Sequence, residues 1–313
     1  MRFSTAAPAT ADPAATAYSL EFDPRLVEES VLLAIDRAAL ATRRRFRHRR
    51  DPLYEIEQPE RRESAFNELS RRWFVRLELG DPVRQALARE PSIAAGTAKC
   101  LVVPVVKARQ EYADLKPDLD DEGLPVLLLC LRASTLVDRD RLVPFLRHDL
   151  LHIADMLDSD FGFDPQLPTL DDSAALDNLL RQRYQTLWDT TIDGRLLARS
   201  ELPAAAEAAR RHEFLGVFSM LGEGGERWFQ RFLRGPRPSH AALVGFAAEP
   251  GQSGTGPAHN RCPVCRMPTA TLHPNPSGLE ERTVRAIQRD LPNWHPGRGL
   301  CLQCADLYAV TPA

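Results

Sequence analysis

The chain has 313 residues, of which 43% are hydrophobic and 27% are charged, the balance of an ordinary globular protein with a sizeable core. Forty basic and forty-three acidic side chains give a formal net charge of −3, which excludes a global field that would attract nucleic acid or an anionic membrane. No apolar run approaches the roughly 18 residues of a membrane-spanning helix, which excludes a transmembrane protein.

The N-terminal 17 residues are rich in Ala, Thr and Pro. They lack the charged start and the apolar segment of about 7–15 residues that mark a secretory signal. We therefore expect a disordered tail over residues 1–20 and a cytoplasmic protein. In that reducing compartment, paired cysteines indicate a metal site rather than disulfides.

Residues 21–100 are predicted to be helical. Asp23 and Pro24 supply a helix cap and a first-turn proline, and apolar residues then recur at three- and four-residue steps. Similar stripes predict helices near 62–77 and 82–88.

Six arginines lie between residues 43 and 50. Surfaces that bind nucleic acid usually interleave aromatic side chains with the basic ones, and Phe46 is the single aromatic residue here. A solvated helix end is therefore favoured over contact with nucleic acid.

The pattern changes after residue 100. Aliphatic runs at 101–106 and 125–131 predict two strands of a small buried sheet. A helix is expected at 141–157. After a loop, Asp171 or Asp172 can cap a long helix that runs to about 199, and further helices are expected at 203–221 and 226–233. The predicted fold class is α+β, mostly helical, with a small sheet packed on the helix that carries two histidines and a small C-terminal module. The predicted organisation is a tail at 1–20, a helical region at 21–100, a metal-site region at 101–234, a flexible linker at 235–261 and a zinc ribbon or treble clef at 262–313.

The C-terminal module contains two C-x-x-C pairs, Cys262 with Cys265 and Cys301 with Cys304. Each pair lets two thiolates converge on one tetrahedral ion, so the four cysteines predict one structural Zn²⁺. A helix at 279–291 accounts for the long spacing between the pairs. A fold-stabilising site is favoured over a redox dithiol or a nucleic-acid finger, because a module this small buries little core.

The second motif is His148-Asp149-x-x-His152 on the predicted helix 141–157. Spacing i, i+4 places both imidazoles on one helix face, where they can bind one ion. The segment 101–199 resembles the zincin metallopeptidases, whose active helix carries H-E-x-x-H after a strand. The resemblance implies that the two histidines bind Zn²⁺ and that Asp149 is the general base. Asp149 stands where those enzymes have Glu, and its shorter side chain places the carboxylate about 1.5 Å further from a bound water.

The third ligand of this histidine site has three candidates, all aspartates. Asp193 is favoured because it lies on a later helix, as the distal acid does in one zincin branch, and Asp189 lies one turn before it. Asp158 corresponds to the ligand of another branch, which has a Gly where this chain has Asp155. Asp155 is expected to hydrogen-bond His152 from outside the metal shell.

Three functions follow as hypotheses. The first is a metal-dependent hydrolase, in particular a zincin-like metallopeptidase with a peptide or protein substrate, linked to a structural zinc ribbon. The alternative is a non-catalytic zinc-binding scaffold whose ribbon docks a protein partner. Binding of nucleic acid through the ribbon and the arginines is a third, less favoured reading.

Overall fold

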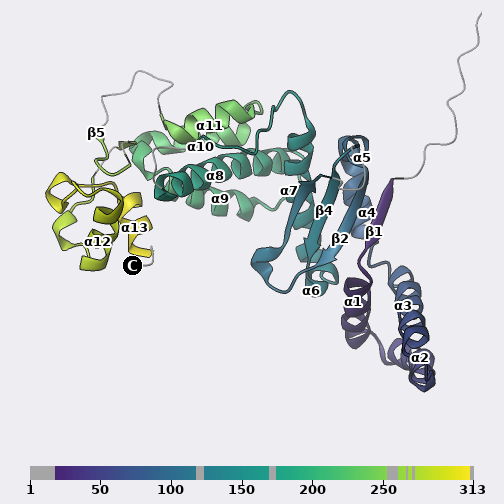
Figure 1. Ribbon diagram of the computed structural model, residues 1–313. Coiled ribbons are helices and arrows are strands. Elements are labelled where there is room, and N and C mark those ends of the chain that lie inside the picture. The colour runs from purple at the N-terminus through teal and green to yellow at the C-terminus, as the bar shows by residue number, and fades with distance from the viewer. Residues whose placement is uncertain are drawn as a thin grey trace, which may run out of the picture. The chain divides into compact units, whose positions relative to one another are not determined.

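The structure is a computed structural model, and it describes residues 18–117, 123–168, 174–251, 260–265, 267–269 and 272–310. The chain divides into two compact units, Met1–Val143 and Pro144–Ala313. Helices predominate and one small mixed sheet is present, which confirms the predicted α+β class (Figure 1). Residues 1–17 of the predicted tail lie outside the described residues.

The sheet of the first unit has four strands in the order β1-β2-β4-β3. Their bounds are Ser19–Phe22 for β1, Lys99–Pro104 for β2, Tyr112–Lys116 for β3 and Val126–Leu131 for β4. Strands β1, β2 and β4 run parallel, and β3 is antiparallel to β4. The two predicted strands are β2 and β4. Strand β1 was not expected, since residues 19–20 were assigned to the tail and residues 21–22 to the helical region; it is ordered by pairing with β2.

The helices of the first unit are α1 to α6, at Pro24–Arg37, Leu40–Arg50, Pro59–Arg76, Asp81–Arg89, Pro91–Gly96 and Ala133–Leu136. The predicted cap of α1 is present, since the Asp23 carboxylate accepts a hydrogen bond of 2.8 Å from the backbone N–H of Arg25. The arginine-rich stretch forms most of a separate helix, α2, in which Phe46 is the buried residue.

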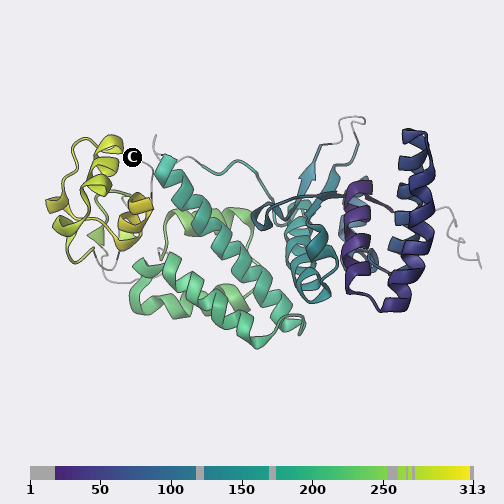
Figure 2. The same cartoon turned by 90° about the horizontal axis from the view of Figure 1, so that it is seen from below.

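The second unit is built around a long central helix. Helix α8 (Ala174–Ala198) packs against α9 (Ala204–Val217), α10 (Gly225–Arg234) and α11 (His240–Ala248) (Figure 2). Leu187, Ile192 and Leu196 of α8 enter the core, yet polar residues such as Asp193 are also buried. Buried polar groups need partners, so the polar side of α8 has to be matched by other polar side chains. Those partners come partly from α7 (Arg139–Leu157), which carries both histidines of the motif.

Gly194 permits the close approach of α8 and α10. A Cβ atom at this position would lie 1.8 Å from the backbone oxygen of Leu233, which no packing adjustment of a side chain can relieve. We expect Gly194→Ala to lower the free energy of unfolding by roughly 1–3 kcal/mol, as overpacking does. Gly245→Ala is the control, because nothing lies within 4 Å of that site, and it should raise stability by about 0.4–1 kcal/mol. Thermal unfolding measures both, and equal shifts would refute the close-packing explanation.

The stretch predicted as a flexible linker contains helix α11. Its hydroxyl cap, Ser239, accepts from the N–H of Ala242, and its Leu243 and Ala247 are buried in the core of the unit. The burial of Leu243 and Ala247 therefore outweighs the Pro- and Gly-rich composition around them. Residues 252–259, which carry much of that composition, lie outside the described residues.

The C-terminal module consists of short elements. They are β5 (Asn260–Arg261), β6 (Pro268–Thr269), α12 (Glu281–Asp290) and α13 (Leu302–Val310). The predicted helix at 279–291 is α12. In the described part of the chain, no helix combines the length and apolarity needed to cross a bilayer.

Candidate metal centres

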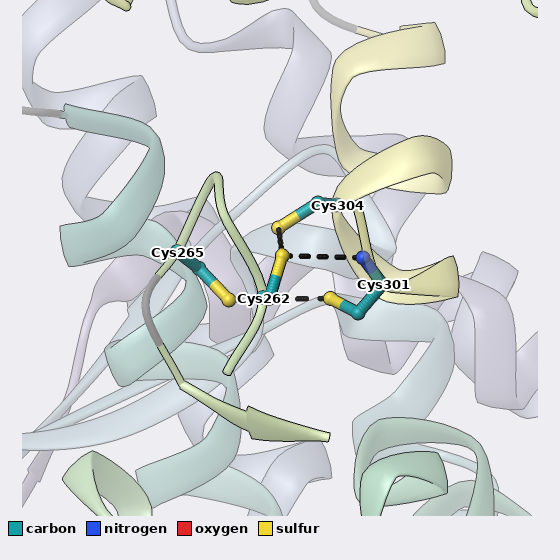
Figure 3. Close-up of side chains that lie close together, drawn as sticks. All are labelled: Cys262, Cys265, Cys301 and Cys304. Carbon is teal, nitrogen blue, oxygen red and sulfur yellow. Dashed lines mark hydrogen bonds between the residues drawn. The ribbon is translucent and has the colours of Figure 1, made fainter. Parts of the chain in front are cut away.

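The four cysteines of the two C-x-x-C pairs meet in one buried cluster, called here the cysteine cluster (Figure 3). The Sγ atoms of Cys262 and Cys304 are 3.9 Å apart, and those of Cys265 and Cys301 are also 3.9 Å apart. A disulfide would need about 2.05 Å, so the thiols are not bonded to one another. A tetrahedral ion with bonds of about 2.3 Å separates its sulfur ligands by about 3.8 Å. The cysteine cluster therefore has the dimensions of a metal site, as predicted.

Local structure brings the two pairs together. Cys262 and Cys265 lie in the turn between β5 and β6, while Cys301 and Cys304 lie at the start of α13. The backbone N–H of Cys301 donates to the Cys262 sulfur at 3.1 Å. Hydrogen bonds from the neighbouring thiols, first that of Cys265, lower the pKa of the Cys262 thiol. The thiolate is the form of cysteine that binds metal.

The other two cysteines, Cys100 in β2 and Cys130 in β4, are buried in the sheet of the first unit. Cys100 is fully buried, and this burial raises the pKa of its thiol to about 12. A thiol that stays protonated is an inert core side chain.

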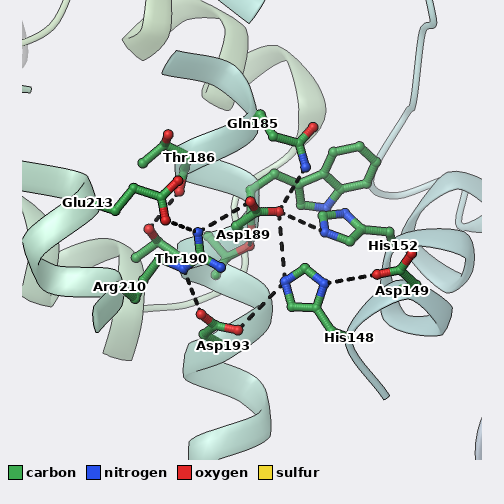
Figure 4. A network of polar contacts seen from close by, with 12 residues as sticks. His148, Asp149, His152, Gln185, Thr186, Asp189, Thr190, Asp193, Arg210 and Glu213 are labelled. Atoms are coloured by element: carbon green, nitrogen blue, oxygen red, sulfur yellow. Dashed lines mark hydrogen bonds and ion pairs between the residues drawn. The ribbon is translucent and has the colours of Figure 1, made fainter. Parts of the chain in front are cut away.

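The two histidines of α7 face Asp189 of α8 (Figure 4). The ring centroids of His148 and His152 are 4.9 Å apart. Asp189 Oδ1 lies 3.0 Å from His152 Nε2 and 3.8 Å from His148 Nε2. These three residues form a group whose ligand atoms all lie within 4.8 Å of one another. Asp189 is thus an acid within reach of both imidazoles.

Asp193, the acid favoured from the sequence, lies beside this group. Its Oδ1 is 3.6 Å from His148 Nε2, but the group that reaches both histidines contains Asp189 in its place. Four ligands around one ion at about 2.0–2.2 Å would be about 3.3–3.6 Å apart. The distances of Asp189 and Asp193 to the ring nitrogens bracket this range. We call His148, His152, Asp189 and Asp193 together the histidine–aspartate site.

An arginine of α9 holds both acids. Arg210 Nε donates to Asp193 Oδ2 at 2.6 Å, and its Nη1 lies 3.3 Å from Asp189 Oδ2 and 2.7 Å from Glu213. Each aspartate therefore turns one oxygen toward Arg210 and the other toward the histidines, as Figure 4 shows. Gln185 also donates to Asp189 Oδ1 at 2.8 Å. This arrangement fixes the orientation of the carboxylates that face the imidazoles.

Asp149, the expected general base, contacts the other nitrogen of the His148 ring. Its Oδ1 lies 3.3 Å from His148 Nδ1, on the side away from the aspartates. Burial alone would lower the pKa of His148, but the hydrogen bond with Asp149 and the charges of Asp189 and Asp193 outweigh it and raise that pKa. A carboxylate on the distal nitrogen of a histidine ligand orients the ring.

Asp155 has a structural role that differs from the expected hydrogen bond to His152. It is fully buried and accepts hydrogen bonds from Trp188 Nε1 at 2.8 Å, from Arg195 at 2.6 and 2.9 Å, and from Arg237 at 3.0 Å. The Trp188 ring in turn packs edge-on against His152, with centroids 4.4 Å apart. Asp155 therefore supports the histidine indirectly, through the tryptophan.

Asp158, the third candidate ligand, is paired with Arg237. This ion pair lowers the pKa of Asp158. Arg210 and Gln185, which hold the acids in place, were not singled out from the sequence. In the sequence, Arg210 is one basic residue among many and Gln185 is an amide residue one turn before Asp189. Such residues are too common on helices to be selected as site residues.

The comparisons with known proteins give no family for the chain. No family model matches it, and no curated protein and no solved structure shows significant similarity to it. The resemblance to zincin metallopeptidases thus rests on the motif alone, and both candidate metal centres rest on their geometry.

Proposed function

We propose that this chain binds two zinc ions, a structural ion in the cysteine cluster and a second ion at the histidine–aspartate site that serves a hydrolase. One observation carries the proposal for the second site. His148 Nε2 is buried and has no hydrogen-bond partner in the described part of the chain, yet it faces carboxylate oxygens at 3.6 and 3.8 Å. Such distances are too long for hydrogen bonds but suit atoms that share an ion.

The residues support a division of labour. His148, His152 and Asp189 would hold the ion, which would supply a water whose pKa is lowered to about 7. Asp193, oriented by Arg210, would serve as the proton acceptor beside the ion. Asp149 holds the His148 ring in the orientation that presents Nε2.

Hydrolysis of a peptide or protein substrate is the reaction that the zincin resemblance implies, with Asp193 in the role that this resemblance assigns to Asp149.

The alternative is a non-catalytic scaffold whose C-terminal module docks a protein partner. It is favoured by the ion pairs of Arg210, which already offset part of the negative charge of the two aspartates. The side chains of the site are also only 8–22% exposed, which leaves little room for a substrate. A closed site is typical of a structural role.

Metal counting tests the second site. We expect purified protein to hold two zinc ions per chain and the double variant His148→Ala, His152→Ala to hold one. His212→Ala removes an exposed histidine of α9 and is the control, which should keep both ions. One zinc ion per chain in the parent protein would refute the histidine–aspartate site.

Peptide-library cleavage then separates hydrolase from scaffold. Loss of a general base typically slows a reaction about 10²–10⁴-fold, so Asp193→Asn should lower kcat by that factor while keeping both ions. Asp149→Asn should act mainly on metal affinity, about 10–100-fold. A parent protein that holds two ions and cleaves nothing supports the scaffold, and an Asp193→Asn variant that loses one ion makes Asp193 a ligand.

A further inference from the structure

A buried arginine stands beside the cysteine cluster. Arg183 of α8 is fully buried, and its Nη2 donates to Gln303 Oε1 at 2.8 Å. Its Nε and Nη1 have no hydrogen-bond partner, and no carboxylate of the described residues pairs with it. Gln303 lies between Cys301 and Cys304 in the sequence, so the guanidinium is held at the second C-x-x-C pair.

A buried cation without a counter-ion is strongly unfavourable. Burial lowers the pKa of the Arg183 guanidinium, and the charges that oppose this effect are those of the four cysteines, first Cys265. Four thiolates around one divalent cation leave two net negative charges on the cluster. A metal-loaded cluster therefore supplies the negative charge that the described residues otherwise lack around Arg183.

Apolar contacts also join helix α8 to the C-terminal module. Leu176 and Leu179, in the first turns of α8, belong to one buried hydrophobic core with the cysteines and with Trp294 of the module. The N-terminal half of α8 thus contacts the module through both an apolar patch and a buried charge.

We propose that Arg183 is the counter-ion of a tetrathiolate metal centre and that this charge pair anchors the C-terminal module to α8. The inference rests on the cysteine-bound metal of the proposed function and is independent of the histidine–aspartate site. Asp189 follows Arg183 by six residues on the same helix, about 9 Å along its axis. The thiolate centre therefore positions the helix that carries the acids of the other site.

The test uses the full chain with His148→Ala and His152→Ala, so that only the cysteine cluster binds metal. Affinity is measured by competition between the protein and a chelator for Co²⁺, read from the thiolate-to-cobalt absorption. Removing an outer partner of a metal ligand typically costs 10–100-fold in affinity, and we expect this loss for Arg183→Met. Arg183→Lys keeps the positive charge, so its loss of Co²⁺ affinity should be smaller.

Arg181→Met is the matched control, because Arg181 is exposed two residues away on the same helix. It should bind Co²⁺ as the parent does. Equal affinity of the Arg183→Met and Arg181→Met variants would overturn the counter-ion role. Absence of the thiolate-to-cobalt band in the parent would instead refute the metal in the cysteine cluster.

Hydrogen exchange gives a second measurement that needs no substitution of Arg183. In the same variant without His148 and His152, chelation of the metal should speed exchange of the amides of residues 176–186, since the anchor on α8 is lost. Unchanged exchange in this segment after metal removal would overturn the anchoring role, even if Arg183→Met fails to fold.

Discussion

Replacing Cys301 and Cys304 by serine is expected to remove one metal ion per chain and to unfold the C-terminal module. The module has few long elements, and its core is built around the four sulfurs, with Trp294 among the buried side chains. Structural zinc contributes about 10–16 kcal/mol of apparent binding free energy in small zinc-binding peptides, and in such modules that energy is folding energy. Loss of half the ligands should therefore leave the module without a stable fold.

Metal counting, Trp294 fluorescence and limited proteolysis after residue 260 measure this effect. The control is Cys100→Ala, which changes a buried thiol of the sheet and should keep the full metal content. A double serine variant with unchanged metal content and unchanged proteolysis would show that the cysteine cluster is not a metal site.

Asp155→Ala is expected to cause the largest loss of stability outside the cysteine cluster. The substitution leaves Arg195 and Arg237 without their buried carboxylate and Trp188 Nε1 without an acceptor. Removing one partner of a buried ion pair typically costs about 3–5 kcal/mol, because the remaining charge stays buried and unpaired. Denaturant unfolding at neutral pH measures the change.

Asp158→Ala serves as the comparison. Asp158 pairs with the same Arg237 but at the surface, where solvent screens the interaction, so the substitution should change stability little. A similar loss in both variants would mean that burial of the Asp155 carboxylate does not govern its contribution. Asp155→Ala should also weaken metal binding by the histidine–aspartate site, since Trp188 packs against His152.

The sequence predicted the features that depend on short-range geometry. The spacing of each C-x-x-C pair already brings two sulfurs together, and two pairs in one short module then predicted the cluster. The i, i+4 spacing of His148 and His152 likewise follows from the helical repeat. Helix boundaries were predicted within a few residues where an apolar stripe and a cap coincide, as at Asp23.

Other features required the tertiary structure. Asp189 and Asp193 lie one turn apart on α8, so only the way α8 faces α7 determines which of them reaches both imidazoles. Strand β1 forms only because β2, some eighty residues away in the chain, offers a free edge.

The sequence by itself determined the ligand types, two thiolate pairs and an imidazole pair, because their spacing is set by local backbone geometry. The tertiary structure decided what surrounds them: Arg210 across from the aspartates and Arg183 beside the thiols. Both are arginines among the 40 basic residues of the chain, and nothing local distinguishes them. Burial beside a specific charge gives each its role, and burial is a property of the packed helices rather than of any short segment.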